Sequence, residues 1–237
     1  MSDTVADRFL GGRLVLRQPV HGYRAGADAL LLAAAVEAAP RLMEAGCGAG
    51  AALLAAALRC PEAQLVGVER EAAMAVLARE NVVANGFADR VTIAEGDALA
   101  NGPTFDGVFC NPPYAETGEG SAPHGARVHA HVTEATLDRW IAALSNRLSG
   151  AGALTLIHRA ERLDRILAAL DGRLGDVTVL PVRPRADAPA HRVLVRARKG
   201  SRAPMKILRG LDLHDDSDAK FTSEAEAIFR GEEAIAW

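Results

Sequence analysis

Four consecutive residues, Asn111-Pro112-Pro113-Tyr114, have the types needed to act on a flat amino group. They follow an apolar run, residues 105–110, that predicts a buried strand, and two prolines, which cannot donate hydrogen bonds to a sheet, end that strand at once. Asn111 is therefore expected at the carboxyl end of a strand, where open α/β sheets bind their ligands. Because a residue before proline is held extended, the carbonyl groups of Asn111 and Pro112 are expected to form a fixed pair.

Such a pair suits a planar NH2 group whose lone pair is delocalised into an amide or a nucleobase. The Asn111 side-chain oxygen and the Pro112 carbonyl could accept its two hydrogens while Tyr114 stacks on the attached ring. The alternative interpretation is a proline-stiffened turn without chemistry, and the cofactor signals upstream favour the catalytic one. Asn111, Pro112 and Tyr114 are thus the candidate catalytic residues, and Pro113 and Tyr114 are candidate substrate contacts.

A glycine-rich segment upstream predicts a strand, a loop and a helix. The strand ends near Glu44, the loop holds Gly46, Gly48 and Gly50, and the helix begins at Ala51. Glycines let the backbone come close to a ligand and turn sharply into the helix. The loop alone does not exclude NAD, because Ala51 stands where the dinucleotide fingerprint allows Gly or Ala.

Two more acids follow the next two predicted strands. Glu69 ends the buried strand of residues 65–69, about 20 residues beyond the glycines, which is the spacing at which a carboxylate accepts hydrogen bonds from ribose hydroxyls. Asp97 and Ala98 follow the strand of residues 91–94. A lone acid after a strand is usually a turn residue or a helix cap. Acids at three successive strand ends indicate a ligand site.

A further glycine-containing loop, residues 21–28, precedes a predicted helix. Tyr23, Gly26 and Asp28 belong to it, and Asp28 or a neighbouring residue is the expected helix cap. Such a loop can offer backbone N–H groups to a carboxylate. An ordinary capped helix packed on the sheet explains the same residues equally well.

Asn-Pro-Pro-Tyr resembles the catalytic motif of the amino-methyltransferases, which transfer a methyl group from S-adenosylmethionine to amino groups of adenine, cytosine, guanine or glutamine. Residues 44–50 resemble the first motif of class I methyltransferases. The resemblance implies S-adenosyl-L-methionine as cofactor, with the acid Glu44 near its sulfonium and Asp97 accepting from its adenine amino group. The expected cofactor-binding residues are Tyr23, Gly26, Asp28, Glu44, Gly46, Gly48, Gly50, Glu69, Asp97, Ala98 and Asn111.

A closer resemblance covers most of the chain and is to the small-domain methyltransferases grouped with the valine-tRNA adenine N6 enzyme. It rests on residues 9–12, 22–28 and 111–114, and on residues 193–195 leading to Lys199-Gly200. The resemblance implies methyl transfer to adenine N6 in tRNA. Alternatives are a ribosomal RNA or DNA amino-methyltransferase, a protein-glutamine N5-methyltransferase of release-factor type, an NAD-dependent oxidoreductase, and a binding protein without turnover.

The predicted elements alternate between strand and helix, which is typical of an α/β fold. Residues 177–180 and 193–195 predict an antiparallel pair near the end of this series. The order matches the class I methyltransferase fold that the resemblance implies. That fold is Rossmann-like, with a seven-stranded, mostly parallel sheet, a terminal antiparallel hairpin and helices on both faces.

We expect one methyltransferase domain over residues 1–237. Residues 1–25 are expected to form an N-terminal extension of strand and loop. Residues 200–237 are expected to form a basic, then acidic, C-terminal extension that ends in a short helix capped by Ser223.

The composition is that of a soluble globular protein, with 49% hydrophobic and 24% charged residues. No apolar run is long enough to span a bilayer and the N-terminus lacks a signal-peptide pattern, so a cytoplasmic location is expected. The three cysteines are odd in number and have no CxxC spacing, which indicates neither a disulfide framework nor a zinc site.

The net charge of −3 argues against a uniformly basic nucleic-acid binder, but the charge is uneven. Residues 181–210 hold nine Lys and Arg residues and a single acid, Asp187. Such a stretch can form a positive surface for a phosphate backbone, and a solvated arginine-rich surface is the alternative. Arg196 and Lys199 are its candidate substrate contacts.

The segment after the motif, residues 115–131, loses all periodicity. A loop of this length beside a site predicts a substrate lid, with Arg127 and His131 as candidate contacts to phosphate or base edges. Its histidines lack the Cys or carboxylate partners of a recognisable metal site, so no metal is expected.

Overall fold

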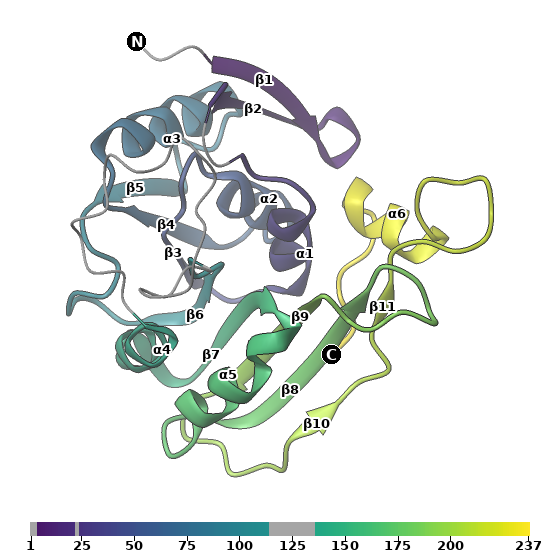
Figure 1. Ribbon diagram of the computed structural model, residues 1–237. Helices are drawn as coiled ribbons and strands as arrows, with labels where there is room; N and C mark the ends of the chain where they lie inside the picture. Colours follow the sequence, from purple (N-terminus) through teal and green to yellow (C-terminus); the bar gives the residue numbers. More distant parts are fainter. Residues whose placement is uncertain (1–3, 22–23, 114–135) are drawn as a thin grey trace.

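The computed structural model describes residues 4–21, 24–113 and 136–237, which are built around one large sheet (Figure 1). In this part of the chain the sheet has nine strands, in the order β10-β8-β9-β7-β6-β3-β4-β5, with β11 paired to β8. The strands are β3 (Arg41–Ala45), β4 (Gln64–Glu69), β5 (Val91–Glu95), β6 (Phe105–Cys110), β7 (Leu148–Arg159), β8 (Gly175–Arg183), β9 (Arg192–Arg198), β10 (Lys206–Ile207) and β11 (Leu211–Asp212).

The seven long strands confirm the predicted class I methyltransferase sheet. β3 to β7 pair in parallel, whereas β9 runs antiparallel to both β7 and β8. The predicted number of strands is corrected from seven to nine, because β10 and β11 add to β8 in parallel. Each has only two residues, and both use backbone groups that the edge strand β8 leaves unpaired.

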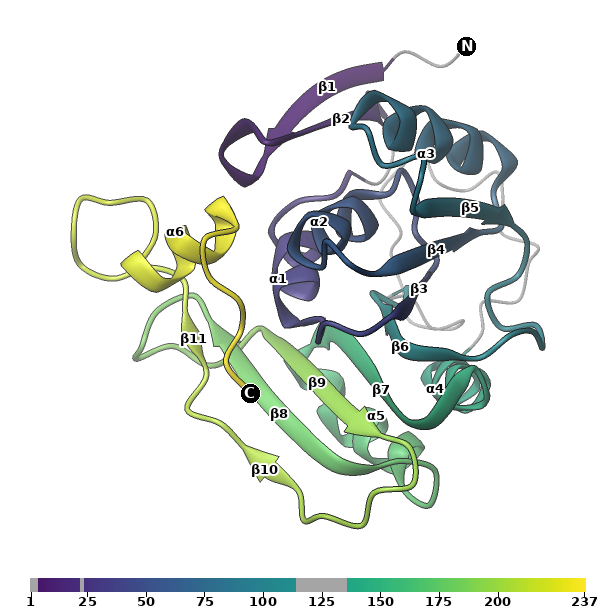
Figure 2. The same cartoon turned by 180° about the vertical axis from the view of Figure 1, so that it is seen from behind.

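Helices cover both faces of the sheet (Figures 1 and 2). Side chains alternate between the faces along a strand, so Leu42 packs in one core and its neighbour Met43 in the other. Strands buried in this way consist of nearly continuous apolar residues. The first core is covered by α1 (Ala27–Ala35), α2 (Ala51–Arg59) and α3 (Ala72–Ala84), and the second by α4 (Leu137–Asn146) and α5 (Leu163–Leu170).

The N-terminal residues form a hairpin outside the main sheet. β1 (Thr4–Phe9) and β2 (Leu14–Pro19) are connected by a short 3-10 turn and pair only with each other in the described structure. The hairpin lies against α3 (Figure 1). Leu14, Leu16 and Gln18 alternate with exposed neighbours along β2 and are buried. The period of two therefore fixes which face of β2 packs on the protein.

The C-terminal residues return to the start of the molecule. Helix α6 (Ser223–Arg230) packs beside α1 (Figure 2). Its cap is Thr222, whose hydroxyl accepts a hydrogen bond from Ala225 N, so the predicted cap Ser223 is wrong by one residue. Throughout the described ranges, each helix is either too short or too polar to cross a membrane.

Candidate functional site

The residues predicted to form a site follow four neighbouring strands. β5, β4, β3 and β6 run parallel, so the loops after them meet at the carboxyl edge of the sheet. From β3 the chain continues to β4 on one side of β3, whereas β6 lies on its other side. The order of the strands therefore reverses between β3 and β6, and α/β sheets bind ligands at such a switch point. The structure thus brings together the glycine loop (residues 46–50), Glu69, Asp97 and Asn111.

The glycine loop is folded by its own backbone. Gly46 N and Cys47 N both donate to Val68 O of β4, and Gly50 N donates to Cys47 O. Gly46, Gly48 and Gly50 have φ angles of 74°, 54° and 90°, in the left-handed region that favours glycine. The alternating glycines of the motif are therefore required by the turn itself.

Two neighbours that the sequence analysis did not single out shape this loop. A Cβ on Gly46 would lie 3.4 Å from the Trp140 ring of α4, so the loop passes close to that ring. A Cβ on Gly67 of β4 would lie 2.6 Å from Leu53 Cδ2 and 2.8 Å from Cys47 Sγ. Only glycine at position 67 leaves room for Cys47 beneath the loop. A glycine inside a strand pattern was the available signal.

The Glu69 carboxylate accepts hydrogen bonds from two backbone N–H groups. Its Oε2 accepts from Gly48 N at 2.8 Å, and its Oε1 accepts from Glu71 N at 2.9 Å. A carboxylate has about four acceptor positions, so each oxygen can still accept from a hydroxyl. The predicted role in binding ribose hydroxyls is compatible with this geometry and stays a prediction.

Glu44 lies inside the protein, at 4% exposure. The N–H of Leu53, in the first turn of α2, donates to its carboxyl group, and its Oε2 has no hydrogen-bond partner among the described residues. Burial, and secondarily the charge of Glu69, raise its pKa well above the usual value. Burial favours the neutral form of this acid, and its predicted place near the cofactor sulfonium stays a prediction.

Asp97 and Ala98 follow β5 at the same edge. Asp97 is exposed, and its Oδ1 accepts from Leu99 N at 2.9 Å, so part of its function is to hold a turn. Ala98 is buried in the core on the α4 face. The second Asp97 oxygen can accept from an amino group, which is the predicted role.

Asn111 directly follows β6, between the ends of β3 and β7. The last residue of β6, Cys110, pairs with Ala45 of β3 and Leu156 of β7. The Asn111 side-chain oxygen is buried, Pro112 is buried, and Pro113 is exposed. The predicted position of the motif at a strand end is confirmed. Four predicted site residues lie outside the described residues, namely Tyr23, Tyr114, Arg127 and His131.

Helix α1 begins after Gly26. Gly26 is the N-terminal cap and accepts a hydrogen bond from Ala29 N. Asp28 lies in the first turn instead, and its Oδ2 is 2.9 Å from Arg192 Nε of β9. The cap is therefore the neighbour of Asp28, and Asp28 joins the helix to the terminal hairpin of the sheet.

Arg196 and Lys199 both contact other parts of the protein, and their predicted role as substrate contacts stays a prediction. β9 runs antiparallel, so Lys199, which follows it, lies toward the edge opposite Asn111, whereas Arg196 pairs with Thr155 and is level with Phe109 of β6. Lys199 Nζ donates to Ser145 O near the end of α4 and to Leu148 O at the start of β7. The Arg196 guanidinium lies 4.7 Å from the centre of the Trp237 ring. Both cations stabilise the fold.

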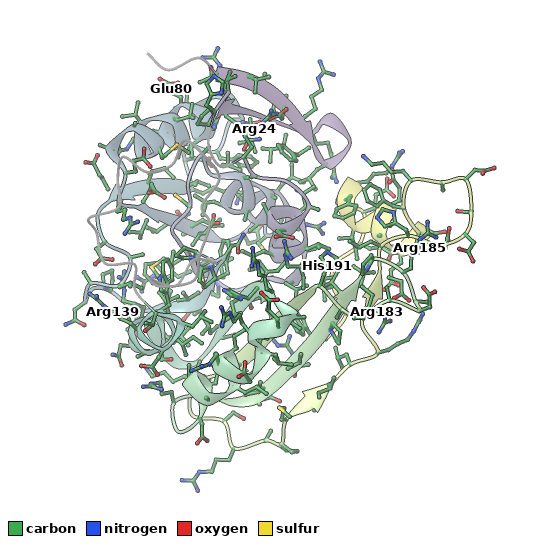
Figure 3. The ribbon with its side chains drawn as sticks, viewed as in Figure 1. Arg24, Glu80, Arg139, Arg183, Arg185 and His191 are labelled. Atoms are coloured by element: carbon green, nitrogen blue, oxygen red, sulfur yellow. The ribbon has the colours of Figure 1, made fainter. Side chains whose placement is uncertain are left out.

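The positive surface predicted for residues 181–210 is largely neutralised within the protein. Arg183 and Arg185 lie beside the C-terminal segment (Figure 3). Arg183 is 2.6 Å from Asp212 of that segment, and Arg185 is 3.1 Å from Asp216. Further ion pairs of this stretch are Arg192–Asp28, Arg196–Glu37, Arg198–Glu37, Arg198–Asp176, Lys206–Asp176 and Arg209–Asp212. All five of these acids lie outside residues 181–210 in the sequence, so the charge of the stretch alone does not show the pairing.

Comparison with known proteins agrees with this architecture. A structure of a predicted O-methyltransferase from Agrobacterium tumefaciens has a TM-score of 0.75 and 29% identity, covering 89% of this chain and 99% of that one. A geranyl diphosphate C-methyltransferase from Streptomyces coelicolor, in complex with S-adenosyl-L-homocysteine, has a TM-score of 0.54 at 16% identity, over 73% of this chain and 78% of that one. The second likeness concerns the fold alone.

Curated relatives are similar over most of the chain. The tRNA1(Val) (adenine(37)-N6)-methyltransferase of Porphyromonas gingivalis is 30% identical over 194 residues, which are 74% of this chain and 76% of that protein. The enzyme of the same name from Aeromonas hydrophila is 30% identical over 182 residues, 75% and 77% of the two chains. The family pattern described as methyltransferase small domain matches residues 22–182. With this match and the fold, the chain belongs to the methyltransferase small domain family and is a methyltransferase.

Proposed function

We propose that this protein transfers a methyl group from S-adenosylmethionine to the N6 amino group of an adenine in tRNA. The observation that carries the proposal is the position of Asn111-Pro112-Pro113 beside the glycine loop, at adjoining ends of β6 and β3. The tRNA1(Val) adenine N6-methyltransferases that are 30% identical to it over the aligned residues support the choice of substrate.

The residues of the carboxyl edge fit this cofactor. Backbone groups of the glycine loop can come close to it, because Gly46, Gly48 and Gly50 have no side chains in the way. Glu69 and Asp97 have acceptor positions to spare for ribose hydroxyls and an adenine amino group. When bound, the cofactor supplies an activated methyl group on a sulfonium. The loop of residues 21–28, with Tyr23, Gly26 and Asp28, would receive its methionine end.

Asn111 and Pro112 would hold the nucleophile. The Asn111 side-chain oxygen and the Pro112 carbonyl accept the two amino hydrogens, which fixes the direction of the nitrogen lone pair. Both oxygens stabilise positive charge that develops on nitrogen during transfer, and their fixed positions require little reorganisation. An adenine in a folded RNA must first swing out, at a cost of a few kcal/mol, offset by contacts to Pro113 and Tyr114.

A methyl-transfer assay tests the proposal. Purified protein is incubated with methyl-labelled S-adenosylmethionine and, separately, with total tRNA, ribosomal RNA, DNA and protein. Label in N6-methyladenine of tRNA is the expected result, and label confined to protein glutamine or DNA would refute the tRNA assignment. Asn111→Ala should reduce turnover by about 100- to 1000-fold, by analogy with removal of one preorganised polar group. The exposed Asn101→Ala is the matched control and should retain activity.

A further inference from the structure

A buried asparagine connects the N-terminal hairpin to the glycine loop. Asn81 of α3 is 1% exposed, which is unusual for an uncharged amide in a helix interior. Its Oδ1 accepts from Arg17 N of β2 at 2.9 Å, and its Nδ2 donates to Arg17 O and to Ala49 O, both at 2.9 Å. Every N–H of the amide is therefore used, as a buried polar group requires.

Asn85, one helical turn later, makes a related contact without touching the loop. Its Oδ1 accepts from Val15 N at 3.0 Å, and its Nδ2 donates to Val15 O and to Asn81 O at 2.8 Å. Four helical residues advance about 6 Å and two strand residues about 6.7 Å, so the two amides match alternate residues of β2. Both asparagines dock the hairpin on α3, but the bond to Ala49 is specific to Asn81.

The loop is thus held from two sides. Asn81 binds the carbonyl of Ala49, while Glu69 binds the N–H of Gly48. A segment with three left-handed glycines has little conformational preference of its own. Fixing it before a ligand arrives removes an ordering cost from binding.

The next residue of β2 holds the second loop of the site. Gln18 is 2% exposed, and its Oε1 accepts from Ala25 N, just before the cap of α1. Its Nε2 donates to Asp7 Oδ2 at 2.8 Å, and Arg24 binds the same carboxylate at 2.7 Å (Figure 3). The hydrogen bonds from Arg24 and Gln18 lower the pKa of Asp7. Adjacent residues of one strand therefore locate both loops.

We propose that Asn81 is a positioning residue for the cofactor loop, and that β2 sets the two loops in register with each other. This inference rests on the proposed function, because it assigns the loops to the S-adenosylmethionine site. The hairpin then contributes to cofactor affinity without contacting the cofactor.

The test compares Asn81→Ala with Asn85→Ala, using calorimetry with S-adenosylhomocysteine. Each variant loses contacts to β2, but only Asn81→Ala releases the loop. Asn81→Ala should raise the Kd by about tenfold or more, whereas Asn85→Ala should stay within about twofold of wild type. In turnover assays, Asn81→Ala should raise the KM for S-adenosylmethionine while kcat recovers at saturation. Equal changes in Kd for both variants would overturn the inference.

Three further measurements separate the possible failures. Wild-type protein that does not bind S-adenosylhomocysteine would contradict the proposed function itself, whatever the variants do. If Asn81→Ala is unfolded at the assay temperature, Asn81→Ser replaces it in the calorimetric comparison with Asn85→Ala, because serine keeps a hydroxyl donor. Gln18→Ala tests the second loop with Asn81 intact, and an unchanged Kd would overturn the proposal that β2 locates that loop for the cofactor.

Discussion

Gly67→Ala tests whether the interior beneath the glycine loop is already full. The added Cβ would lie 2.6 Å from Leu53 Cδ2, 2.8 Å from Cys47 Sγ and 3.0 Å from Ile93 Cδ1. Carbon atoms pack best at about 3.5 to 4.0 Å, so three neighbours on three elements must move. Overfilling a packed core costs about 1 to 3 kcal/mol, which corresponds to a fall in Tm of about 2 to 12 °C for a chain of this size.

The same substitution should also affect the loop, because Cys47 is one of the displaced neighbours. We expect the Kd for S-adenosylhomocysteine to rise by about tenfold, as a shift of the loop weakens contacts made by its backbone. Denaturant unfolding gives the loss of stability, and calorimetry gives the loss of affinity. Both are measured at a temperature well below the Tm of the variant.

Gly107→Ala of β6 is the matched control. Its Cβ would meet Leu42 Cδ2 at 2.6 Å, with Ala153 O at 4.0 Å as the next neighbour. One rotated side chain costs about 0.5 to 1.5 kcal/mol, and the glycine loop is not involved. Gly107→Ala should therefore lower stability without changing the Kd. Unchanged stability and Kd in Gly67→Ala, or an equal rise in Kd in Gly107→Ala, would refute this account of the loop.

Two further predictions concern the side chains of Glu44 and Lys199. Burial raises the pKa of Glu44, so its contribution to stability is complete below about pH 4.3 and is lost as the pH rises through the folded-state pKa. Glu44→Gln should remove this decline in the free energy of unfolding, which is at most about 1.4 kcal/mol per pH unit. Urea unfolding measured from pH 5 to 8 tests this, and a dependence on pH that is unchanged in Glu44→Gln would contradict it. Lys199→Met should cost about 1.5 to 3 kcal/mol, because the carbonyls of Ser145 and Leu148 lose a charged donor. Its RNA affinity and the salt dependence of binding should match wild type, and a loss of either would restore Lys199 to the substrate surface.

Features set by neighbouring residues could be predicted from the sequence. The apolar run before Asn111, the glycines of residues 46–50 and the acids Glu69 and Asp97 each follow a strand that its own residues favour. Parallel strands then gather these ends at one edge of the sheet, whatever the details of the loops. The place where these residues gather follows from strand order, so the sequence predicts it, while their binding and catalytic roles stay predictions.

Features set by distant partners could not be predicted in this way. The roles of Arg196 and Lys199 depend on Glu37, Trp237 and the end of α4, none of which lies near them in sequence. The two-residue strands β10 and β11 carry no periodic signal, and form because the edge of β8 is available. The raised pKa of Glu44 depends on burial, which is a property of the folded chain.

The N-terminal hairpin and the C-terminal segment hold opposite ends of helices α1 and α2. At the carboxyl edge, β2 holds the segment before α1 through Gln18 and the loop before α2 through Asn81. At the other end, Trp237 Nε1 donates to the last carbonyl of α1, and Arg59, the last residue of α2, donates to two backbone carbonyls of the C-terminal segment. A loop that carries its own ligand contacts needs rigid supports on both sides. The hairpin and the C-terminal segment supply them, so the extensions belong to the structure of the site even though the glycine loop and Asn111 lie outside them.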